Sequence, residues 1–127
     1  MSDLRSPIAR ARGLGTARDG THHWWIQRVT AVALVPLTIW FAISLIRVAP
    51  EGQAAAKAWL ASPVTMVALI LAIVAGFWHA VLGVQVVIED YVHAKGWRIG
   101  LDMAVKFIAV GLAVAGVVAI LRIGFGG

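Results

Sequence analysis

One histidine, His79, lies in the middle of a long uncharged stretch that runs from residue 58 to residue 88. Neutral imidazole is a common ligand for metals and heme iron, and its second nitrogen can be held by a further hydrogen bond. A histidine that hydrogen-bonds between two helices is an equally acceptable interpretation. His79 is therefore a candidate metal or heme ligand with a structural alternative.

Small residues accompany His79 at helical spacing. Gly76 and Gly83 lie three residues before it and four after it, on the same face of a helix. A flat face suits a planar macrocycle, but Ala72, Gly76 and Ala80 also match the small-xxx-small pattern by which membrane helices pack. The chain's other candidate ligands lie near predicted helix ends: His22, His23, His93, Met66 and Met103. A six-coordinate heme would therefore take its second ligand from another chain.

A second polar cluster, Glu89-Asp90-Tyr91, closes the same stretch. Tyr91 is twelve residues beyond His79, which is about 18 Å along a helix axis. A phenol beside a carboxylate can donate to a quinone carbonyl and help relay a proton from water. The alternative is an interfacial tyrosine beside solvated acids.

Arg28 follows a run of histidines and tryptophans, where its guanidinium could pair with a propionate or another anion. Its alternative role is to extend toward lipid headgroups. Gln85, Asp102 and Lys106 receive no functional assignment, because the four-residue spacing of the last two predicts a local ion pair.

Three apolar segments position these residues. Of the 127 residues, 61% are hydrophobic and 13% are charged, unlike the balance of water-soluble domains. The segments predict an all-α membrane protein with spans at about 25–48, 63–91 and 101–123, because each can cross a hydrocarbon core of about 30 Å. The chain has no cysteine, which excludes disulfides and thiolate metal sites.

Basic residues are distributed unevenly around the spans. The N-terminal segment and the predicted 92–100 loop side carry eight of the eleven lysines and arginines, and three lie on the opposite side: Arg47, Lys57 and Arg122. This excess predicts a cytoplasmic N-terminus and a periplasmic C-terminus. We expect a cytoplasmic segment, 1–23, and a three-helix anchor domain, 24–127, in a bacterial inner membrane, with the mitochondrial inner membrane as the alternative. The net charge of +5 then indicates lipid headgroups and not nucleic acid.

The run HAVLGVQVVIEDY, residues 79–91, is similar to the second-helix signature of the hydrophobic membrane anchor subunits of succinate dehydrogenase. The shared pattern is H-x-x-x-G-x-x-x-x-x-x-D-Y. The stretch from GLG at 13–15 through THHWWIQRVTA at 21–31 also resembles the start of these anchors in alphaproteobacteria. The likeness covers most of the chain, although the third span matches in length and little else.

This resemblance implies a complex of four subunits that serves electron transport and the tricarboxylic acid cycle. A flavoprotein oxidises succinate, an iron-sulfur subunit transfers electrons, and two membrane subunits, the cytochrome b subunit with the anchor, hold heme b and reduce ubiquinone. By position, the resemblance implies that His79 ligates heme iron, Tyr91 donates to the quinone and Asp90 helps deliver protons. It also implies that Arg28 pairs with a heme propionate.

Three other functions remain open at this point. The anchor of a fumarate reductase would work with menaquinol in the reverse direction through a similar bundle. A small transporter or proton channel would use His79 to bind or relay the transported ion. A purely structural anchor would tether soluble subunits and leave His79 merely packed.

Overall fold

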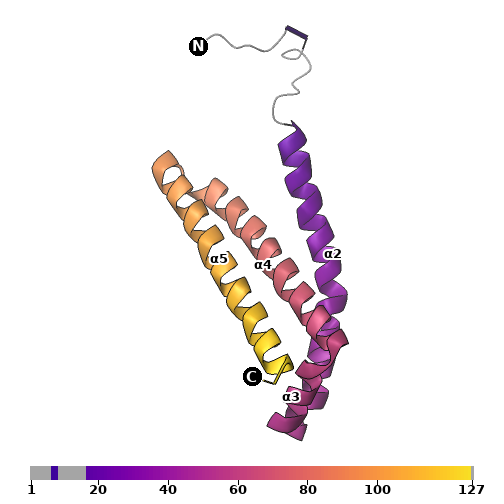
Figure 1. Ribbon diagram of the computed structural model, residues 1–127. Helices are drawn as coiled ribbons and strands as arrows, with labels where there is room; N and C mark the ends of the chain where they lie inside the picture. The colour runs from indigo at the N-terminus through magenta and orange to yellow at the C-terminus, as the bar shows by residue number, and fades with distance from the viewer. Residues whose placement is uncertain (1–6, 9–16, 127) are drawn as a thin grey trace.

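The computed structural model describes residues 7–8 and 17–126, and no strand occurs among them. In chain order the elements are α2 (Ala17–Val48), the short 3-10 helix η1 (Ala49–Glu51), α3 (Gln53–Ala61), α4 (Pro63–Tyr91) and α5 (Lys95–Gly124) (Figure 1). α2, α4 and α5 are long and apolar enough to cross a membrane. The predicted all-α fold with three spans is confirmed.

The helix ends follow local chemistry. α4 begins at Pro63, where the missing N–H costs nothing, and ends at Tyr91, both as predicted. α2 begins at Ala17 and not near residue 25, and α5 begins at Lys95 and not near residue 101. Both helices extend into polar sequence because a helix does not stop at the hydrocarbon boundary. The predicted 92–100 loop is therefore reduced to residues 92–94.

A short helix, α3, was not predicted. Gly52 separates it from η1 with a φ of 88°, a backbone conformation that residues with a Cβ rarely adopt. Trp59 of α3 packs on α2, with its ring centroid 5.9 Å from that of Trp40 and 6.3 Å from that of Phe41. This aromatic cluster explains why Trp40 lies inside the first span and not at its end.

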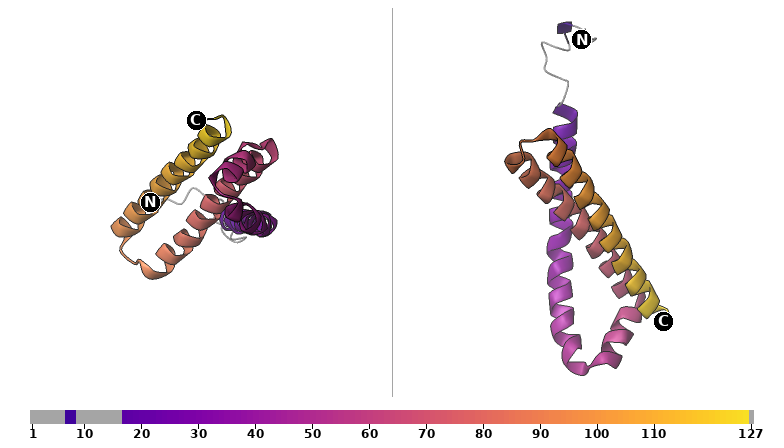
Figure 2. Two further views of the ribbon diagram at one scale, coloured as in Figure 1. Left: turned by 90° about the horizontal axis from the view of Figure 1, so that it is seen from below. Right: turned by 90° about the vertical axis from the view of Figure 1, so that its left-hand side faces the viewer.

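α4 is the central helix, with contacts to both α2 and α5. α4 crosses α2 near the middle of both helices, where a Cβ on Gly76 would lie 3.8 Å from Leu34 Cδ2, and the C-terminal end of α4 lies apart from α2, while α4 and α5 run side by side (Figures 1 and 2). A Cβ on Gly116 of α5 would lie 3.0 Å from Ile73 Cδ1 of α4, so the Ile73 side chain packs directly over this glycine.

A polar bridge also joins α4 to α5. Gln85 Nε2 donates to Asp102 Oδ1 at 2.6 Å, and Lys106 Nζ donates to Asp102 Oδ2 at 2.8 Å. The predicted ion pair between Asp102 and Lys106 is confirmed, and Gln85 extends it to a second helix.

Few of the described residues are buried within the chain: Thr65, Leu69, Leu82, Ile88, Ala109 and Ile120. Most apolar side chains of the spans point outward instead. That distribution is expected for helices whose outer faces meet lipid or other membrane proteins.

Candidate functional site

His79 lies on α4 and is half-buried, on the side of that helix that packs against α2. Its Nδ1 is 3.1 Å from Oγ1 of Thr30, a half-buried residue of α2. A hydrogen bond between helices thus holds one ring nitrogen, as the structural interpretation of His79 required. The second nitrogen decides whether the ring can also be a ligand.

That second nitrogen, Nε2, is available. The structure gives it no hydrogen bond within the described part of the chain. Every buried side-chain nitrogen or oxygen in the described residues has a hydrogen-bond partner. Because Nε2 has none, it is not buried and reaches the molecular surface. A ring held at one nitrogen and open at the other has the donor arrangement of a heme-ligating histidine. The residues present therefore fit an axial heme ligand.

The two glycines that flank His79 differ in their surroundings. A Cβ on Gly76 would lie 3.8 Å from Leu34 Cδ2 of α2, so this part of the face packs against a helix. A Cβ on Gly83 would meet nothing within 4 Å. The flat surface that the sequence predicted is thus open on the Gly83 side and covered beside Gly76.

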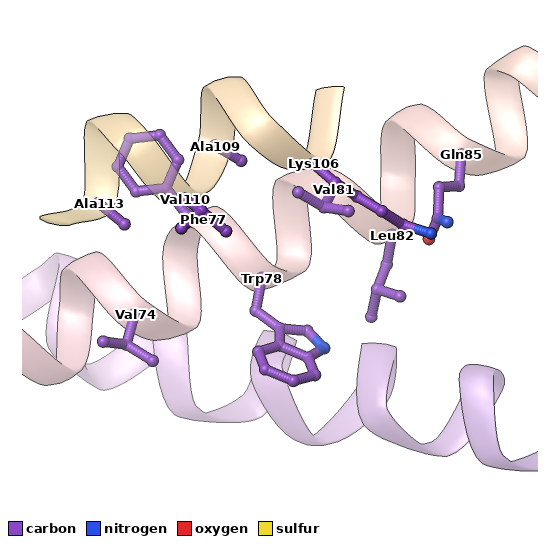
Figure 3. A pocket seen from close by; sticks show the side chains of 10 residues that line it. All are labelled: Val74, Phe77, Trp78, Val81, Leu82, Gln85, Lys106, Ala109, Val110 and Ala113. Atoms are coloured by element: carbon purple, nitrogen blue, oxygen red, sulfur yellow. The ribbon is translucent and has the colours of Figure 1, made fainter. Parts of the chain in front are cut away.

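Two apolar grooves lie on the bundle, and neither includes His79. One, of about 610 Å³, is formed by residues of α2, α4 and α5: Phe41, Leu69, Ala72, Ile73, Gly76, Phe77, Ala80 and Ile120. The other, of about 360 Å³, lies between α4 and α5, and Trp78 is one of the residues that line it (Figure 3). Gln85 and Lys106 approach each other at one end of this second groove, and Phe77 and Ala113 lie toward the other.

The acidic and phenolic cluster lies at the C-terminal end of α4. Tyr91 is 78% exposed and Asp90 is exposed, so neither is enclosed by this chain. Arg98 of α5 donates to the Val92 carbonyl at 3.2 and 3.1 Å and to the Glu89 carbonyl at 3.4 Å. A cation at the C-terminus of a helix satisfies free carbonyls and opposes the helix dipole. Arg98 thereby fixes the end of α4 that carries Tyr91.

Arg28 is exposed on α2, with its guanidinium carbon 5.4 Å from the centre of the Trp24 ring, in a cation–π contact. Arg28 precedes Thr30 by two residues, which places the two side chains about 200° apart around the helix. The face of α2 that touches His79 is therefore not the face that carries Arg28.

The chain does not bring its candidate residues together. Tyr91 follows His79 by twelve residues of continuous helix, about 18 Å along the axis. Among the described residues, no group of three or more histidines, acids or cysteines could hold a metal ion. His79 and Tyr91 are thus isolated from each other within the chain, and a heme or quinone site at either residue would require groups from outside the chain.

Sequence reasoning missed Thr30 and Arg98 as contacts of the site. Thr30 was part of the run that resembles the anchor family, but nothing in its position showed that it faces His79. Arg98 was counted only as a topological charge. Its place seven residues after the end of α4 was a usable signal, because a cation just past a helix often binds the last carbonyls.

The fold defines a class of protein: a helical membrane protein with three spans. Sequence comparison is more specific. The chain belongs to the family of succinate dehydrogenase/fumarate reductase transmembrane subunits, whose sequence profile matches residues 2–120.

Individual relatives match over most of the chain. A protein of Rickettsia bellii named succinate dehydrogenase hydrophobic membrane anchor subunit is 35% identical over 119 residues, 93% of this chain and 94% of the relative. A protein of the same name from Paracoccus denitrificans is 33% identical over 121 residues, 95% of this chain and 93% of the relative. The succinate dehydrogenase membrane anchor subunit of Reclinomonas americana is 28% identical over 96 residues, 73% and 80% of the two chains.

Proposed function

We propose that this chain is the hydrophobic membrane anchor of a succinate:quinone oxidoreductase, a non-catalytic subunit that helps to hold heme b and to form the ubiquinone reduction site. The names of its relatives support the class of complex. The heme site is supported by one observation: inside a spanning helix, Thr30 holds Nδ1 of His79 while Nε2 of the same ring stays open. A polar group is costly to keep in hydrocarbon, so an open ring nitrogen there calls for an occupant.

In this proposal His79 would hold the iron of heme b through Nε2. The other histidines, His22, His23 and His93, lie in the first turns of α2 or just after α4, far from His79 along the helices. The other ligand is then supplied by the cytochrome b subunit, and the heme is shared between two chains. When bound, the heme supplies a one-electron redox centre. The part of this chain is to hold the ring and to present the open surface at Gly83.

The quinone site is proposed at the end of α4. The Tyr91 phenol donates a hydrogen bond to a quinone carbonyl, and the Asp90 carboxylate accepts protons from water and passes them on. Both side chains are exposed, so a quinone and a neighbouring protein can reach them. Arg98 keeps this helix end ordered through its bonds to the Glu89 and Val92 carbonyls.

Reduction of one quinone consumes two electrons and two protons. The electrons come from the iron-sulfur subunit, which receives them from the flavoprotein and docks on the cytoplasmic face beside Tyr91. The protons enter from the same face through Asp90. Because both charges come from one side, turnover moves no net charge across the membrane.

Arg28 is proposed to bind a heme propionate. Its guanidinium can form two parallel hydrogen bonds to a carboxylate. To do so the side chain must leave Trp24 and turn around α2 toward α4, because it starts about 200° from Thr30. Contact with lipid headgroups is the alternative use of the same cation.

The chain is proposed to lie in a bacterial inner membrane with its N-terminus in the cytoplasm. Three spans place the start of α2 and the end of α5 on opposite sides, and these ends point in opposite directions (Figure 1). The basic N-terminal segment and Lys95 and Arg98 then share the cytoplasmic side.

Purification of the whole complex tests this function. A tag on the C-terminus of the full chain should recover the flavoprotein, iron-sulfur and cytochrome b subunits together, with succinate-dependent quinone reduction. The same membranes without the tag are the control. Recovery of the chain without any succinate-oxidising activity would contradict the proposal and would favour a transporter or channel.

A fumarate reductase anchor is the second candidate, because the family description includes both enzymes. The purified complex distinguishes them by direction. A succinate dehydrogenase reduces ubiquinone with succinate faster than it reduces fumarate with menaquinol, and the reverse ratio identifies the second candidate.

A further inference from the structure

The hydroxyl of Thr30 has three polar neighbours. Oγ1 lies 2.9 Å from the Ile26 carbonyl oxygen and 3.1 Å from the Gln27 carbonyl oxygen, both in the preceding turn of α2. It also lies 3.1 Å from Nδ1 of His79 on α4. A threonine in a helix commonly donates to a carbonyl three or four residues earlier in this way.

Counting protons fixes the direction of the contact with His79. A hydroxyl has one proton, and carbonyl oxygens only accept. If that proton went to His79, Oγ1 would face two carbonyl oxygens at 2.9 and 3.1 Å with no proton between them. The favourable arrangement gives the proton to a carbonyl of α2 and leaves Oγ1 to accept from the ring.

We propose that Thr30 is a positioning residue that holds His79 with its proton on Nδ1 and its lone pair on Nε2. The contact also sets the rotation of the ring about the Cβ–Cγ bond, because Nδ1 must point at Thr30 on α2. Nε2 then points to the open surface as a ready ligand. The consequence for heme rests on the proposed function, whereas the proton placement rests only on the three distances.

An acceptor at Nδ1 makes the ring a more basic ligand, which favours ferric over ferrous iron. Removal of that acceptor should raise the midpoint potential of the heme. Each tenfold loss in the ratio of ferric to ferrous affinity corresponds to about 59 mV for a one-electron couple. A contact that serves only to pack α2 on α4 would leave this potential unchanged.

Redox titration of the purified complex tests the proposal with three substitutions at one position. Thr30→Val keeps the branched shape and removes the acceptor, Thr30→Cys leaves a weak acceptor, and Thr30→Ser keeps the hydroxyl. The matched control is Thr38→Val, at an exposed threonine two turns further along α2. We expect a more positive potential in Thr30→Val, a smaller shift in Thr30→Cys, and values near wild type in Thr30→Ser and in the control.

Heme-containing Thr30→Val and Thr30→Cys complexes with the wild-type potential would overturn the proposal. If Thr30→Val does not assemble, the Thr30→Cys value alone decides in the same way. The His79→Ala variant separates failure of the Thr30 proposal from failure of the heme-ligand proposal. A wild-type heme signal that is lost in His79→Ala, together with unshifted Thr30 variants, would reject the role of Thr30 and keep the heme ligand. A signal unchanged in His79→Ala would reject the ligand, and the role of Thr30 with it.

Discussion

Gly83 offers the sharpest test of which face of α4 meets the rest of the complex. A Cβ at this position meets nothing within 4 Å in this chain. The side chain of a leucine at this position starts in open space, and leucine improves helix propensity over glycine by about 1 kcal/mol. A loss of heme in this variant is therefore expected from contacts with groups outside the chain.

The expected loss follows from the proposed contact. If heme or a partner helix lies against Gly83, a leucine there overpacks the contact and costs about 1–3 kcal/mol. At about 1.4 kcal/mol for each factor of ten, heme affinity should fall by about 5- to 140-fold. Gly111→Leu is the control, because a Cβ on that exposed glycine of α5 also meets nothing within 4 Å.

Heme content per flavin in the purified complexes measures this difference. We expect Gly83→Leu to be depleted and Gly111→Leu to be close to wild type. Full heme content in Gly83→Leu would refute the assignment of this face. Equal depletion in both variants would trace the effect to the leucines themselves and not to the position of Gly83.

Three further substitutions test other contacts. Tyr91→Phe should lower quinone reduction about tenfold, the factor that about 1.4 kcal/mol of hydrogen bonding provides, while succinate oxidation by an artificial acceptor stays intact; equal loss of both activities would indicate failed assembly. Arg98→Met should raise the KM for quinone and leave the heme spectrum unchanged, because it removes only the bonds to the Glu89 and Val92 carbonyls; an unaltered KM would show that this cap does not serve the quinone site. Gln85→Leu should destabilise the complex by about 0.5–2 kcal/mol through loss of its bond to Asp102, measured as a lower Tm in detergent, and an unchanged Tm would argue against that bridge.

The three spans could be predicted because length and charge determine which segments cross a bilayer. The 63–91 prediction matched α4 at both ends, since Pro63 starts the helix and the acidic cluster marks its end. α3 could not be separated in the same way, because its last residues are as apolar as the span that follows. α3 is bounded by Gly52, whose φ is 88°, and by the extended backbone of Ser62, which separates it from α4.

The contacts of the site depend on rotations that spacing does not specify. His79 and Thr30 are 49 residues apart on different helices, and a turn of α2 about its axis would bring another face toward the ring. The depth of His79 could be read from one helix alone. Its partner, and the difference between Gly76 and Gly83, required the packing of two helices.

A reduced-minus-oxidised absorption spectrum shows whether Nε2 of His79 binds heme iron. Complexes purified through this chain from wild type and from His79→Ala should both contain the flavoprotein, and only the wild type should show the full b-type heme signal. A heme signal of equal size in the His79→Ala complex would contradict the account. So would a colourless heme region in a wild-type complex that still passes electrons from succinate to quinone.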